Sequence, residues 1–133
     1  MSRARLGWGK ALGIALGLTC LHGVLVLATL GVLLLWVPSF EGLFAEMGTA
    51  LPAPTILTID ASHLFRSWWF LWVPLLALGG LVDLAHLASL ARFGGWLWSV
   101  LLGLLEAAAL LAVPLLMAAS LYLPIFTMAQ AVQ

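Results

Sequence analysis

Three long apolar stretches dominate the chain. They cover residues 11–37, 68–91 and 96–126, and few polar side chains interrupt them. Each stretch exceeds the ~20 residues that a helix needs to cross the hydrocarbon core of a bilayer. The pattern therefore predicts an all-α, polytopic membrane protein in which residues 1–133 form one membrane domain with three transmembrane helices.

The segment between the first two stretches, residues 38–67, has a different pattern. Pro38 directly follows the first stretch, and we expect it to end that helix because proline interrupts helices. Apolar residues then recur at helical spacing, which predicts a short amphipathic helix in this outer loop. These residues are Phe40, Leu43, Phe44, Met47 and Leu51.

Two prolines and a tight connection set further boundaries. Pro52 and Pro54 are expected to break the loop helix. Thr55 is then the expected N-cap of a helix that runs through Arg66 into the second span. The connection at residues 92–95, RFGG, is short enough to make the second and third spans an antiparallel helical hairpin.

Composition excludes most soluble functions. Hydrophobic residues make up 65% of the chain and charged residues 8%, against roughly 45–50% and about 25% in soluble domains. Five basic side chains offset by five acidic ones give no net charge, so a nucleic-acid-binding surface is not expected. The single cysteine, Cys20, has no partner for an internal disulfide.

The basic residues predict an orientation. Arg3, Arg5 and Lys10 precede the first span and Arg92 follows the second, whereas only Arg66 lies in the outer loop. Because basic residues concentrate in cytoplasmic segments, we expect a cytoplasmic N-terminus and an outside C-terminus. The first apolar stretch has 27 residues, against about 7–15 in a signal peptide, so we expect it to stay uncleaved.

Four ionisable side chains interrupt the spans: His22, Asp83, His86 and Glu106. At 1.5 Å per residue, His22, Asp83 and Glu106 lie roughly 16, 14 and 15 Å from the cytoplasmic ends of their helices. Such groups are costly in lipid and are expected to face protein or water. Two interpretations remain open: a hydrogen-bonded set that fixes helix packing, and a proton or cation relay.

No enzymatic chemistry is expected from this sequence. Asp83 and Glu106 form the only candidate carboxylate pair, and no nucleophile motif, phosphate-binding loop or metal-ligand spacing accompanies them. We therefore expect no catalytic residues, no cofactor, no resident metal and no small-molecule substrate. Partners are expected to be the lipid bilayer and other membrane subunits or further copies of the chain.

Small residues at four-residue spacing support association with other membrane subunits or further copies of the chain, because they let helices approach closely. They form two sets: Gly9, Gly13 and Gly17 at the start of the chain's first apolar region, and Gly103 and Ala107 in the third span.

Two stretches resemble the type II secretion system F family, which includes the inner-membrane platform proteins of type IV pili. The first is VPSFEGLFAEMGTALPAPT, residues 37–55, and the second is LYLPIFTMAQAV, residues 121–132. The residues that match the family pattern in the first are Pro38, Phe40, Gly48, Leu51, Pro52 and Thr55. Those that match in the second are Leu123, Pro124, Ile125 and Phe126.

The resemblance covers the membrane part of that family, about residues 20–133, and not its cytoplasmic helical domains. It implies a non-enzymatic structural or assembly subunit of a membrane complex in a bacterial inner (plasma) membrane. Two alternatives remain: an accessory subunit of another large membrane complex, and a subunit of an oligomeric proton or cation channel or transporter that uses the intramembrane His, Asp and Glu side chains.

Overall fold

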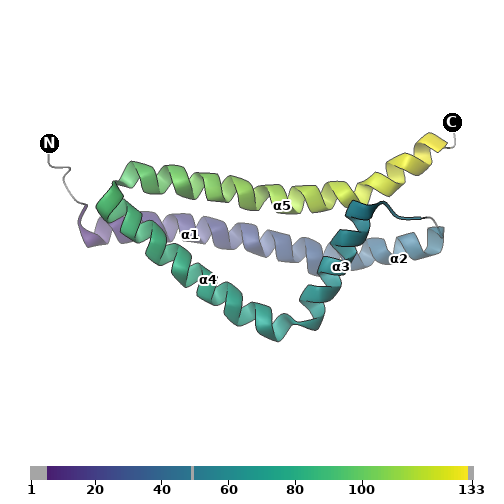
Figure 1. Ribbon diagram of the computed structural model, residues 1–133, viewed down its shortest axis with the longest axis horizontal. Helices are drawn as coiled ribbons and strands as arrows, with labels where there is room; N and C mark the ends of the chain where they lie inside the picture. The colour runs from purple at the N-terminus through teal and green to yellow at the C-terminus, as the bar shows by residue number, and fades with distance from the viewer. Residues whose placement is uncertain (1–5, 49, 132–133) are drawn as a thin grey trace. The chain divides into compact units, whose positions relative to one another are not determined.

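The computed structural model describes residues 6–48 and 50–131, and over these residues the chain is helical with no strand (Figure 1). The elements in chain order are α1 (Trp8–Gly31), the π-helical turn η1 (Val32–Trp36), α2 (Val37–Met47), α3 (Ala53–Ser67), α4 (Trp69–Ser89), the π-helical turn η2 (Leu90–Gly94) and α5 (Trp96–Ala131). The all-α prediction is confirmed.

Three helical segments are long and apolar enough to cross a membrane. They are Trp8–Glu46, Trp69–Gly94 and Trp96–Phe126, with 39, 26 and 31 residues. The second and third match the predicted spans closely. The first is longer at both ends than the predicted 11–37.

The first helix is longer because Pro38 does not end it, so that prediction was wrong. Pro38 lies in the first turn of α2, directly after η1. The N–H of Val37 bonds to the carbonyl of Val32, five residues back. This wider turn accommodates a proline, which lacks an N–H and would otherwise crowd the carbonyl four residues earlier.

The helix ends instead at a glycine. Gly48 has φ +61°, and its N–H bonds to the carbonyl of Phe44. A left-handed residue just past the last turn is a common helix end, and glycine adopts that conformation without strain.

The next helix also begins and ends differently from the prediction. Pro52 is extended, with φ −59° and ψ 148°, and α3 starts at Ala53. Pro54 fits the first turn, where an N–H has no intrahelical partner. Thr55 therefore lies inside α3 and is not its N-cap. The helix does not continue into the second span, because Trp68 leaves helical geometry at φ −112° and ψ 26°.

The chain forms two compact units, each discontinuous in sequence. Unit 1 comprises the chain up to Val26 together with Leu71–Leu111, and unit 2 comprises Leu27–Phe70 and the chain from Ala112. Each unit is described by itself below.

In unit 1, α1 and α4 pack against each other through an apolar cluster. Ala15, Leu87 and Ala88 are buried together, and Leu18 and Leu84 pack against them. The short connection through η2 joins α4 to α5 (Figure 1). The Ser99 hydroxyl donates to the carbonyl of Leu87 at 2.9 Å and ties the two arms of this hairpin together.

In unit 2, an apolar cluster forms around three buried side chains, Val37, Phe44 and Leu121. The residues that pack against it are Val32, Phe40, Leu51, Ile59 and Ile125. One face of α3 is instead polar and buried, and it carries Thr55, Thr58 and Ser62. Their spacing of three and four residues places these hydroxyls in one row along the helix.

Candidate functional site

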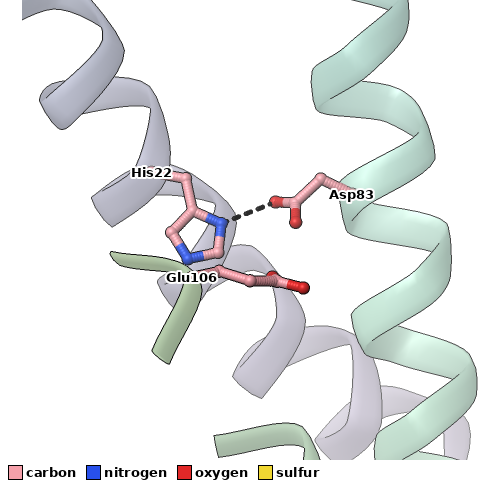
Figure 2. A group of neighbouring side chains, drawn as sticks. All are labelled: His22, Asp83 and Glu106. Atoms are coloured by element: carbon pink, nitrogen blue, oxygen red, sulfur yellow. Dashed lines mark hydrogen bonds and ion pairs between the residues drawn. The ribbon is translucent and has the colours of Figure 1, made fainter. Parts of the chain in front are cut away.

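Three ionisable side chains from three different helices meet inside unit 1. They are His22 of α1, Asp83 of α4 and Glu106 of α5 (Figure 2). One nitrogen or oxygen atom of each lies within 4.8 Å of the other two. His22 is 6% exposed, and the two carboxylates are partly buried. The three side chains that sequence counting placed at one depth are therefore neighbours.

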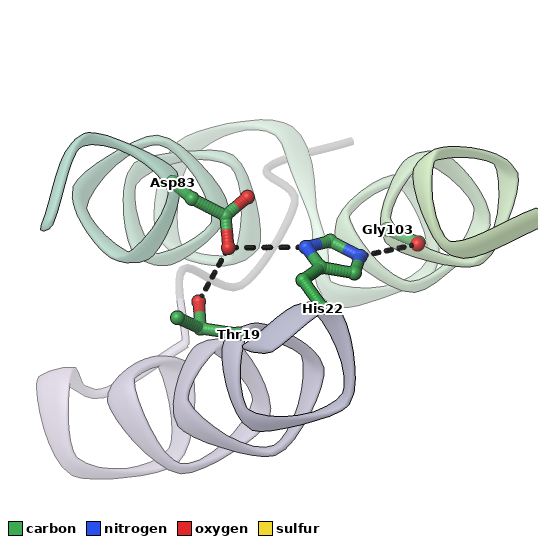
Figure 3. Close-up of polar contacts among 4 residues, drawn as sticks. All are labelled: Thr19, His22, Asp83 and Gly103. Atoms are coloured by element: carbon green, nitrogen blue, oxygen red, sulfur yellow. Dashed lines mark hydrogen bonds and ion pairs between the residues drawn. The ribbon is translucent and has the colours of Figure 1, made fainter. Parts of the chain in front are cut away.

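Both ring nitrogens of His22 have partners, as Figure 3 shows. Nε2 lies 2.8 Å from the backbone carbonyl of Gly103, and Nδ1 lies 3.1 Å from Oδ2 of Asp83. The Thr19 hydroxyl donates to the same Oδ2 at 2.7 Å. Since a carbonyl oxygen only accepts hydrogen bonds, Nε2 carries a hydrogen.

This tautomer determines what can lie between His22 and Asp83. In a neutral imidazole with its hydrogen on Nε2, Nδ1 presents a lone pair. An ionised carboxylate also presents only lone pairs. At 3.1 Å the two atoms would repel each other, so a positive centre belongs between them. It is either a proton, held by the ring or the carboxyl, or a metal ion.

Local sequence explains why α1 and α5 approach closely here. On α1, Ala11 and Ala15 are fully buried on the side that carries His22. On α5, a Cβ added to Gly103 would lie 2.8 Å from Cδ1 of Leu18. Glycine therefore admits Leu18 and brings its own carbonyl within reach of His22. Glu106 follows Gly103 by one helical turn.

Two members of this set were not among the sequence candidates. Thr19 precedes His22 by three residues, and Gly103 precedes Glu106 by three. Positions three apart differ by about 60° around a helix and can share a face, so helical spacing around each ionisable residue was the available signal. No linear metal-ligand motif exists because the three groups come from three helices.

The structure does not bring His86 into this group. Its side chain is exposed, although it follows Asp83 by one turn. Three residues correspond to about 300° of rotation, so the two side chains differ by about 60° around α4. That difference is enough to direct one side chain inward and the other outward.

The loop-motif residues lie in unit 2, where they shape the chain around α3. Phe40 and Leu51 pack against the apolar cluster, Gly48 ends α2, and Pro52 precedes α3. Thr55 donates a hydrogen bond of 2.6 Å to the carbonyl of Ser120. These positions therefore serve turns and packing.

The Thr55 contact links the first of the two family-like stretches, residues 37–55, to Ser120, which directly precedes the second. In an α-helix the carbonyl of Ser120 would accept from the N–H of residue 124, but residue 124 is proline. Thr55 supplies the missing donor. The proline of one stretch thus creates an acceptor that the threonine of the other satisfies.

Comparison with known proteins gave no match: no family model, curated protein or solved structure matches the chain.

Proposed function

We propose that the chain is a non-enzymatic subunit of a membrane complex, assembled through helix packing in a bacterial inner membrane. Its N-terminus is cytoplasmic and its C-terminus lies outside, as the basic residues favour. The observation that carries the proposal is a glycine face on α1 that the chain's own helices leave open.

Gly9, Gly13 and Gly17 recur every four residues on α1. Apart from the helix's own adjacent backbone, a Cβ built on any of them meets no atom of the described residues within 4 Å. Ala11 and Ala15, by contrast, are fully buried on another face of the same helix. One small-residue face of α1 is therefore used inside the chain, and a second one faces outward.

An outward glycine face favours assembly for a reason specific to membranes. Apolar surface gains nothing by leaving lipid, so helices associate by close packing, and small residues permit it. Contact with lipid alone would not require glycine, because larger apolar side chains face lipid equally well. Close packing of a second copy or a partner helix on Gly9, Gly13 and Gly17 explains why these residues are small.

The direct test is the oligomeric state of the full chain in a mild detergent, measured by size-exclusion chromatography with light scattering after crosslinking. Gly13→Leu places a branched side chain in the centre of the face and is expected to dissociate the complex. Gly79→Leu is the matched control, because Gly79 is equally open but lies on α4. A monomeric wild-type chain without co-purifying membrane proteins contradicts the proposal, as does equal assembly of both variants.

The identity of the partner separates the secretion-related function from its alternative. Affinity capture with the wild-type chain and Gly13→Leu, compared by mass spectrometry, identifies proteins whose capture needs the glycine face. Pilin-like or secretion components in that set support a platform-related subunit. A different membrane complex in that set supports the accessory-subunit alternative.

The meeting of His22, Asp83 and Glu106 favours a second candidate, a proton or cation channel subunit, because ionisable groups that meet within a membrane mark ion pathways in many transporters. Flux into liposomes that contain the wild-type chain, Asp83→Asn or Glu106→Gln tests it. Loss of flux in both variants supports a channel, and equal flux in all three removes that candidate.

A further inference from the structure

We propose that His22, Asp83 and Glu106 bind one divalent transition-metal ion, with Zn²⁺ the best match, and that this ion joins α1, α4 and α5 of unit 1. The inference goes beyond the proposed assembly function and does not depend on it, because the site and the open glycine face involve different residues.

The spacing of the three groups suits one small ion. Two atoms bound to tetrahedral zinc at about 2.0–2.2 Å lie about 3.3–3.6 Å from each other. The distance from Nδ1 of His22 to Oδ2 of Asp83 is 3.1 Å, and the largest separation in the group is within 4.8 Å. Glutamate has three rotatable side-chain bonds, so we expect Glu106 to close the remaining separation without backbone movement.

The hydrogen bonds around the group are those that metal ligands require. A histidine that binds a metal usually donates its other ring N–H to a carbonyl or carboxylate, which fixes the tautomer and the ring orientation. His22 donates from Nε2 to the carbonyl of Gly103 at 2.8 Å, which leaves the Nδ1 lone pair toward the carboxylate of Asp83. Thr19 orients Asp83 in the same way through its hydroxyl.

The charge of the site favours a divalent metal ion over a single proton as the positive centre. A neutral His22 with two ionised carboxylates carries two negative charges inside helices that are apolar enough to cross a membrane, where uncompensated charge is costly. One proton on the imidazole offsets only one of them. A divalent ion offsets both and replaces the repulsion between Nδ1 and Oδ2 by two bonds to the same centre.

The ligand types favour a transition metal over calcium or magnesium. Imidazole nitrogen together with carboxylate oxygen suits zinc, iron and manganese. Calcium takes six to eight oxygen ligands, and magnesium prefers near-ideal octahedral oxygen sites. With three protein ligands, a tetrahedral ion has its fourth position open to water.

The test is Zn²⁺ binding to the full chain in mild detergent, after chelator treatment and in competition with a chromogenic chelator, with Ca²⁺ as the control ion. One Zn²⁺ per chain and no comparable Ca²⁺ binding are expected. Glu106→Gln, which keeps the size of the side chain, and Asp83→Asn should each weaken Zn²⁺ binding at least tenfold. Helicity by circular dichroism shows whether each variant remains folded.

Exposed histidines provide the matched control. His63→Gln combined with His86→Gln removes both, and it is expected to leave Zn²⁺ affinity and stoichiometry unchanged. Calorimetry in buffers of different protonation enthalpy should also show proton release on binding, because Zn²⁺ displaces any proton between His22 and Asp83.

Three results would overturn the inference. They are wild-type binding below one equivalent, unchanged affinity in folded Glu106→Gln and Asp83→Asn, and loss of binding in the double histidine control. Either of the first two results would mean that the site holds a proton and no metal ion. The third would mean that Zn²⁺ binds adventitiously to surface histidines. None of them changes the outcome expected for Gly13→Leu.

Discussion

The hydroxyl of Ser62 donates a hydrogen bond of 2.6 Å to the backbone carbonyl of Leu33. Both residues are almost completely buried. In η1 the N–H of Val37 reaches back to Val32, so the next N–H in that register would serve Leu33. That N–H belongs to residue 38, which is proline and has none. Ser62 of α3 therefore satisfies an acceptor that Pro38 leaves without a partner.

This relationship predicts the cost of removing the hydroxyl. Ser62→Ala leaves a buried carbonyl without a donor and is expected to lower the free energy of unfolding by about 1–3 kcal/mol. Unfolding in mixed micelles with increasing dodecyl sulfate measures the change. Ser67→Ala at the exposed end of the same helix is the control, and an equal effect of the two substitutions would refute the account.

Pro38 and Ser62 should be energetically coupled. Pro38→Ala restores an N–H that can serve the carbonyl of Leu33, so the loss of the Ser62 hydroxyl should matter less in that background. A double-mutant cycle over the two sites is expected to give a coupling energy of about 0.5–2 kcal/mol. Additive effects of the two substitutions would show that Ser62 does not compensate for the proline.

The carbonyl of Ser120, which Pro124 leaves without a backbone donor, gives an independent prediction. Thr55 is fully buried and donates to the carbonyl of Ser120. Thr55→Val preserves shape but removes the donor, and it should lower the free energy of unfolding by about 1–3 kcal/mol. Thr55→Ser retains the donor and should recover most of that loss. If Ser and Val destabilise equally, packing of the methyl group and not the hydrogen bond is responsible.

The close approach at Gly103 predicts an asymmetric response to side-chain size. An added Cβ would meet Cδ1 of Leu18 at 2.8 Å, and Leu18 is flexible at that end. Gly103→Ala should therefore be tolerated, whereas Gly103→Val should destabilise by about 1–3 kcal/mol through overpacking. Leu18→Ala should relieve part of the Gly103→Val penalty. Thermal unfolding in detergent measures all three, and a neutral Gly103→Val would exclude a tight contact.

The hydrophobic pattern predicted the helices well because span length and composition are local properties. It also placed His22, Asp83 and Glu106 at one depth, since depth follows from counting residues along a helix. It could not distinguish His86 from Asp83, which differ in rotation about the helix axis. Rotation depends on which faces pack, and Ala15, Leu87 and Gly103 determine that together.

Proline was the residue that local rules described least well. Its missing N–H and bulky ring predicted a helix end at Pro38, yet a π turn and the hydroxyl of Ser62 accommodate it. At Pro124 the hydroxyl of Thr55 has the same effect. The sequence around a proline shows that a backbone carbonyl loses its N–H donor. It does not show whether a hydroxyl from a distant part of the chain will replace that donor.

The sequence by itself determined that this chain is helical, with three segments able to cross a membrane and few polar groups within them. Only the tertiary structure decided which of those groups meet and how each freed carbonyl is satisfied. The physical reason is that hydrophobicity depends on the identity of each residue, whereas a hydrogen bond or a metal site requires atoms from separate helices within a few ångströms of one another.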